Sequence, residues 1–145
     1  MEIQNKKKTI EELLAKQLFF QREYSIYHLE YEQEMKFYKA VQKGDVELVQ
    51  KLMLPLKNEK LGYLSKNSLQ NLKYHLVVLI SMLTRFSIEG GMNPESAYTL
   101  SDIYIQQVDQ LSSEEATEAI HKKIIFDSQN VWQKLHKKQD YRKKL

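Results

Sequence analysis

Cysteine is absent from this chain of 145 residues, and glycine and proline are scarce, with four and two residues. Without cysteine there is no disulfide framework, no thiolate zinc site and no cysteine nucleophile. A β-sandwich or β-barrel needs many turns and would use more glycine and proline, so their scarcity favours an all-helical protein. A chain of this length fits one domain and can bury a single core without covalent cross-links.

Long apolar runs are also missing. The longest apolar stretch, residues 76–83, contains Ser81, whereas a helix that spans a bilayer needs about 20 residues. Residues 1–30 show no apolar segment followed by a small-residue cleavage site, so we expect a cytoplasmic protein without a signal peptide or a membrane partner. Basic residues gather at 6–8 and from Lys134 onward, and we interpret both clusters as solvated tails rather than nucleic-acid contacts.

Apolar spacing and capping patterns predict six helical segments and no strand. Thr9 followed by Glu12 is typical of a capping box, and Asn93-Pro94 is a favourable helix start. The expected helices cover about 9–24, 30–43, 46–53, 68–89, a segment from 94 to about 108, and 114–138. The apolar stripe of the first consists of Ile10, Leu13, Leu14, Leu18 and Phe20, and that of the last consists of Ala116, Ile120, Ile124, Val131 and Leu135, with Ile125, Phe126 and Trp132 beside it.

The segment at about 68–89 is the longest and most apolar of the expected internal helices. Apolar residues cover more than half of its circumference, which is typical of a helix at the centre of a core. Gly90-Gly91 ends it. We therefore predict an all-α fold, an irregular bundle of about six helices around this central helix. Residues 1–133 form the helical domain, and residues 134–145 form a basic tail or linker.

The residue patterns of common active sites are absent. The four histidines are scattered, and none has a partner at the spacing of a metal site such as H-E-x-x-H. There is no nucleophile elbow and no glycine-rich phosphate loop. We expect no catalytic residue, no metal, no cofactor and no enzymatic activity. The alternative is a phosphoacceptor role for His75, but the core-like sequence after it favours a partly buried, hydrogen-bonded histidine.

Two sets of polar and aromatic residues are candidate sites. Arg85 and Glu89 lie four residues apart and can pair along the central helix. Near the core such a pair needs partners, and we interpret it as a structural ion pair or, alternatively, an effector contact. The full set is Tyr74, His75, Arg85, Glu89 and Asp102.

The second set consists of aromatic residues. Tyr24, Tyr27, Tyr31 and Tyr38 fall at spacings of three, four and seven, which predicts one shared helical face. The simpler interpretation is packing within the core. The alternative is a surface for homodimerisation, with Trp132 as a further member, because tyrosine is common at interfaces.

Residues 71–111 carry a family resemblance. The stretch NLKYHLVVLISMLTRFSIEGGMNPESAYTLSDIYIQQVDQL resembles the helical region that precedes the paired helix-turn-helix domain in one branch of AraC/XylS-family regulators from Firmicutes. The run EYEQEMKFYKAVQKGDVELVQKLM, residues 30–53, is similar to the acidic, aromatic segment that precedes that region. The run TRFSIEGGMNPESAYTLSDIYIQ is the most specific part of the match.

The resemblance implies a regulatory region that receives an effector, forms homodimers, or does both. In such a protein DNA is bound only through a separate C-terminal helix-turn-helix domain, which lies outside these 145 residues, and residues 134–145 occupy the position of the linker. The resemblance does not name the effector. The alternative hypothesis is a stand-alone protein-interaction module, or an antagonist that forms heterodimers with full-length regulators.

Overall fold

The computed structural model describes residues 7–53, 55–57 and 60–144, with their side chains except for Trp132 and residues 135–144. This part of the chain forms six helices and no strand, which confirms the predicted all-α class. The helices are α1 (Ile10–Glu23), α2 (Tyr31–Lys43), α3 (Val46–Leu52), α4 (Ser68–Glu89), α5 (Pro94–Asp109) and α6 (Glu114–Lys144). None of these helices combines the length and the apolar character that a bilayer crossing requires.

Local capping chemistry sets most helix starts. The side chains of Thr9, Asp45, Asn67 and Asn93 each accept a hydrogen bond, 2.9 to 3.1 Å long, from the backbone N–H three residues further on. Such a cap stabilises a helix by about 1 kcal/mol because it satisfies a backbone donor that has no partner within the helix. Gly44 ends α2 in the left-handed conformation, with φ of 69°.

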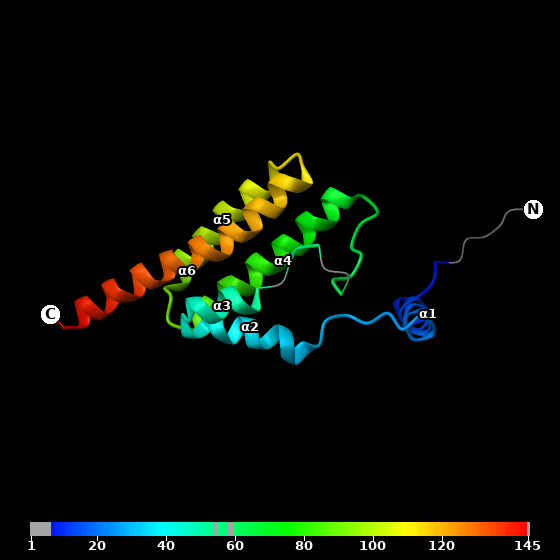
Figure 1. The fold of residues 1–145 in the computed structure, drawn as a ribbon, viewed down its shortest axis with the longest axis horizontal. Coiled ribbons are helices and arrows are strands. Elements are labelled where there is room, and N and C mark those ends of the chain that lie inside the picture. Colours follow the sequence, from blue (N-terminus) through cyan, green and yellow to red (C-terminus); the bar gives the residue numbers. More distant parts are fainter. Residues whose placement is uncertain (1–6, 54, 58–59, 145) are drawn as a thin grey trace, which may run out of the picture.

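The core forms around α4. This helix packs against α2, α5 and α6 (Figure 1). Its buried side chains include Leu72, Leu76, Ile80 and Leu83. They pack with apolar side chains from the three neighbouring helices, which include Val41, Tyr104, Val108 and Ile124. The predicted central helix is thus confirmed in both its extent and its place.

α1 lies apart from the other five helices (Figure 1), and none of its residues is buried. Its predicted apolar stripe faces solvent, and Ile10 is 79% exposed. The chain leaves the helix at Tyr24, Ser25 adopts a φ of 52°, and α2 begins only at Tyr31. The sequence pattern of α1 is therefore a helix pattern, but among the described residues no other helix covers its apolar side.

The buried face of α6 differs from the expected stripe. Ala116, which we expected in the stripe, and Phe126, which we expected beside it, are both exposed. The buried set is Thr117, His121, Ile124, Ile125, Ser128 and Gln129. Four of these six side chains are polar, so an apolar stripe could not identify the face. α6 also continues without a break to Lys144, through the region that we expected to be a tail or linker from residue 134.

Two adjacent glycines form the corner after α4, for different reasons. A Cβ atom on Gly90 would lie 2.1 Å from the carbonyl oxygen of Gln42 in α2, so only glycine allows the two backbones to approach this closely. Gly91 has a φ of 115°, which side chains disfavour. The sequence predicts the helix stop, whereas the contact with α2 is visible only in the fold.

We expect Gly90→Ala to lower the free energy of unfolding by about 1–3 kcal/mol, because the added methyl group forces α2 and α4 apart. Urea unfolding followed by circular dichroism measures the change. Glu89→Ala is the matched control, since Glu89 is the exposed preceding residue. Equal urea midpoints for the two variants would contradict the close approach of the α2 and α4 backbones at Gly90.

Candidate functional site

A pocket of about 220 Å³ opens between the bundle and the loop that joins α3 to α4. Side chains of α2, α4 and α6 form one side. The other side consists of residues 28–29 together with residues 55–56 and 60–62 of this loop. We call the loop between α3 and α4 the covering loop. Most of the lining is apolar, including Phe37, Leu56, Leu79 and Ile125.

Three histidines from distant parts of the sequence line this pocket: His28 before α2, His75 on α4 and His121 on α6. Tyr38 and Glu34 of α2 add polar groups to the same wall. The described residues contain no group of three or more histidine or acidic side chains arranged to hold a metal ion. Because an imidazole ring can both donate and accept hydrogen bonds, the histidines are candidates for hydrogen bonding to a ligand.

His75 holds the covering loop against α4. Its Nε2 lies 2.5 Å from the carbonyl oxygen of Gly62. A carbonyl oxygen only accepts hydrogen bonds, so Nε2 carries the proton and donates. His28 lies on the other side of Gly62, where a Cβ would be 2.8 Å from His28 Nε2. The prediction of a partly buried, hydrogen-bonded His75 is confirmed.

The polar side chains that lie deepest in the pocket are uncharged at neutral pH. Burial, assisted by the charge of Lys122 and opposed by that of Glu118, lowers the pKa of His121 to about 4. Burial, assisted by the charge of Glu34, raises the pKa of the Tyr38 hydroxyl well above its usual value. At pH 7 His121 is thus a neutral imidazole with one donor and one acceptor nitrogen.

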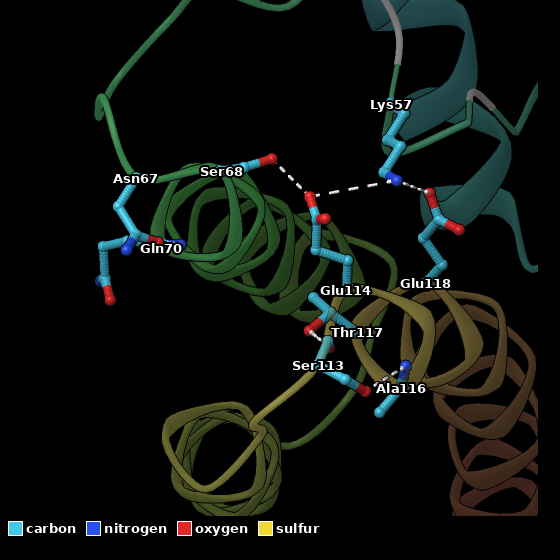
Figure 2. A network of polar contacts seen from close by, with 9 residues as sticks. All are labelled: Lys57, Asn67, Ser68, Gln70, Ser113, Glu114, Ala116, Thr117 and Glu118. Carbon is cyan, nitrogen blue, oxygen red and sulfur yellow. Dashed lines mark hydrogen bonds and ion pairs between the residues drawn. The ribbon is translucent and has the colours of Figure 1, made fainter.

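Ionic contacts attach the covering loop to the start of α6, and a hydrogen bond joins the starts of α4 and α6 (Figure 2). The Lys57 ammonium lies 3.6 Å from the carboxylate of Glu118 and 4.0 Å from that of Glu114. Ser68 at the start of α4 donates to the same Glu114 carboxylate. These groups are largely solvent-exposed, and each such pair contributes less than about 1 kcal/mol.

The backbone of the loop is attached as well. The Leu29 N–H donates to the Lys60 carbonyl over 3.2 Å. The Asn71 side chain accepts hydrogen bonds from the backbone N–H groups of Leu64 and Ser65. The pocket is therefore closed by a loop that several weak contacts hold in place, while helices form its remaining walls.

The predicted polar set on α4 does not come together. Only His75 lines the pocket. Tyr74 and Arg85 are separated by about 16 Å along the axis, since a helix rises 1.5 Å per residue. The guanidinium of Arg85 donates to the Ser81 carbonyl at 3.0 Å and lies 6.0 Å from the centre of the Tyr98 ring.

The predicted pairing of Arg85 with Glu89 is wrong. Both ion pairs found among the described residues use Lys57. Glu89 and Asp102 are exposed at the surface. Because water already solvates these two carboxylates, neither needs a buried partner.

The predicted tyrosine face is divided by the break after α1. Tyr24, Tyr27 and Tyr31 are exposed, and Tyr31 opens α2 instead of continuing α1. Tyr38 is 5% exposed and stacks on Phe86 with ring centres 5.2 Å apart, so it belongs to the core. The side chain of Trp132 lies outside the described residues. The expectation that the four tyrosines share one helical face is therefore wrong.

The sequence did not single out His28, His121, Glu34 or the covering loop. One pattern could have indicated His121: it precedes the buried Ile124 and Ile125 by three and four residues, which places it on their face. No pattern indicated that this face meets His75 and the covering loop. No family model, curated protein or solved structure matches this chain.

We expect the free energy of unfolding to fall, by up to about 3 kcal/mol on account of His121 alone, as the pH is lowered from 6.5 to 4. The unfolded chain takes up a proton at this histidine near pH 6.5, whereas the folded chain resists protonation until about pH 4. The contribution of His121 to the free energy of unfolding is thus complete above pH 6.5 and is lost progressively between pH 6.5 and 4.

Denaturant titrations of the unchanged chain and of His121→Gln across this pH range measure the effect. The difference between the two proteins isolates His121, because all other titrating groups are shared. Parallel pH profiles would show that His121 takes up its proton equally well in the folded chain.

Proposed function

We propose that this chain is the regulatory region of an AraC-type transcription regulator, which receives a small effector and self-associates without enzymatic activity. In this proposal DNA is read by a separate C-terminal helix-turn-helix domain, and the protein acts in the cytoplasm. The observation that carries the proposal is the course of α6. This helix lines the pocket with His121 and Ile125 and continues unbroken to Lys144, past the other helices (Figure 1).

The course of α6 supports a mechanism of signal transfer. A ligand in the pocket contacts α6 directly, together with α2 and α4, which form the same side of the pocket. If it binds one placement of α6 more tightly than another, it shifts the population toward that placement. A continuous helix carries the shift to its far end, where the resemblance in residues 71–111 implies the linker to the DNA-binding domain.

The exposed side of α1 supports self-association. Leu13, Leu14, Leu18 and Phe20 are each about half exposed on one side of a helix of 14 residues. Helices of this length are marginal in water on their own, and most helical stability comes from packing an apolar face. Covering this face with a second copy stabilises α1, at roughly 25 cal/mol for each Å² of apolar surface removed from water. Tyr24 and Tyr27 extend the apolar surface beyond the helix.

The same exposed face favours one other candidate function. A stand-alone interaction module would use α1 to bind a related full-length regulator and form an inactive heterodimer. The regulatory region and the interaction module differ in the features they require. The interaction module needs α1 but does not need the pocket or the continuity of α6.

Self-association is tested by fusing the chain to the N-terminus of a helix-turn-helix domain that binds its operator only as a dimer. We expect the fusion to repress a reporter. Leu14→Gln with Leu18→Gln should weaken repression at least tenfold by removing apolar contacts. The matched control, Glu12→Gln with Lys16→Gln, changes the polar side of α1 and should repress normally.

The outcomes separate the hypotheses. A fusion that does not repress, in cells where it is folded and abundant, contradicts self-association. Equal losses in the two double variants would show that α1 acts through its charges and not through its apolar side. Analytical ultracentrifugation of the unfused chain and of both double variants provides an independent measurement of mass.

The role of the separate DNA-binding domain gives a further expectation. The chain alone should bind the promoter of its own gene no more tightly than a scrambled duplex, and the weak binding should fall steeply with salt, because only phosphate contacts are available. Fluorescence anisotropy with both duplexes at two salt concentrations measures this. Binding of the promoter a hundredfold more tightly would show that the chain itself reads bases.

A further inference from the structure

The pocket beneath the covering loop has walls suited to a ring-shaped ligand. Phe37, Leu79 and Ile125 supply apolar surface from three different helices. Its volume of about 220 Å³ exceeds the roughly 150 Å³ of a buried apolar cavity that admits benzene. One substituted aromatic ring therefore fits, whereas a ligand of nucleotide size does not.

The charges around the pocket disfavour an ionised ligand. Glu34 and Lys60 contribute one charge of each sign to its lining, so neither sign predominates. An anion or a cation entering the pocket would lose its water shell and would meet a like charge as well as an opposite one, which is costly. The histidines, by contrast, offer hydrogen bonds without charge.

One polar group of the pocket is placed for recognition. His121 is 5% exposed and lines the pocket beside Ile125. A neutral imidazole both donates and accepts, which matches a hydroxyl group, since a hydroxyl does the same. His75 is less available, because its Nε2 already donates to Gly62.

We propose that this pocket binds a small uncharged phenol, with its ring among Phe37, Leu79 and Ile125 and its hydroxyl group on His121. The proposal rests on the proposed function, in which the domain receives a small-molecule signal, and it names the chemical class of that signal. Neutral phenols satisfy both features of the site, an apolar volume of ring size and a single uncharged hydrogen-bonding group.

Three probes that share one methyl-substituted ring test the ligand class by isothermal titration calorimetry with the full chain. These are 4-methylphenol, toluene and 4-methylbenzoate, which differ in hydroxyl, hydrogen and carboxylate. We expect 4-methylphenol to bind, toluene to bind about fivefold more weakly for lack of one hydrogen bond, and 4-methylbenzoate not to bind. Tighter binding of the benzoate, or no binding of the phenol at millimolar concentration, overturns the proposal.

Two variants locate the site. His121→Phe keeps an aromatic ring but removes both nitrogens, so the preference for 4-methylphenol over toluene should disappear. Val78→Trp places a large side chain at the mouth of the pocket from a half-exposed position, and it should abolish binding of both probes without disturbing the fold. Ile103→Trp is the matched control, because Ile103 is comparably exposed on α5 and does not line the pocket.

Val78→Trp keeps the test decisive even if His121→Phe does not fold. Phenol binding that survives Val78→Trp would place the site elsewhere and overturn the proposal, whereas binding that is lost in Val78→Trp and kept in Ile103→Trp supports it. The reporter fusion described above needs no ligand, so the two proposals fail separately. Absent phenol binding with intact repression rejects the ligand class alone, whereas phenol binding without repression supports the site and rejects the self-associating regulator.

Discussion

Burial of the apolar surface of α4 is the constraint on which the rest of the structure depends. Leu76 and Ile80 are almost completely removed from solvent, and α2, α5 and α6 all pack against this one helix. Each of the three is thereby placed relative to the others. The pocket lies along the first half of α4, at His75, Val78 and Leu79, where a loop takes the place of a helix as the cover. A loop held by weak polar contacts is easier to displace than a packed helix.

The inner face of α6, by contrast, buries polar side chains. Thr117, His121, Ser128 and Gln129 are buried there, in positions where apolar residues would give a more stable core. Within the described part of the chain, both polar atoms of the Gln129 amide lack a hydrogen-bond partner, which typically costs about 1–3 kcal/mol. One turn later, Gln133 donates to the Gly44 carbonyl over 3.4 Å. A helix packed in this way is held less firmly than α4, which is what the proposed mechanism of signal transfer requires.

Only part of the candidate site could be predicted from residue patterns. The environment of His75 could be predicted, because the apolar residues around it on one helix already imply a core. The convergence of His28, His75 and His121 could not, because it depends on which faces of α4 and α6 meet and on where the covering loop crosses them. Core packing was the simpler interpretation of the tyrosine set and holds for Tyr38, yet the proximity of Tyr38 to the pocket required the same tertiary information.

The sequence by itself determined the helices and most of their ends. Thr9, Asp45, Asn67 and Asn93 cap through atoms within three residues, and the apolar circumference of α4 requires a central place, so local chemistry is sufficient for both. Only the tertiary structure decided that α1 lies apart, that α6 buries a largely polar face, and that Arg85 pairs with no carboxylate. These outcomes depend on contacts between residues far apart in the chain. A helical pattern specifies which side of a helix is apolar, but not which partner, if any, covers it.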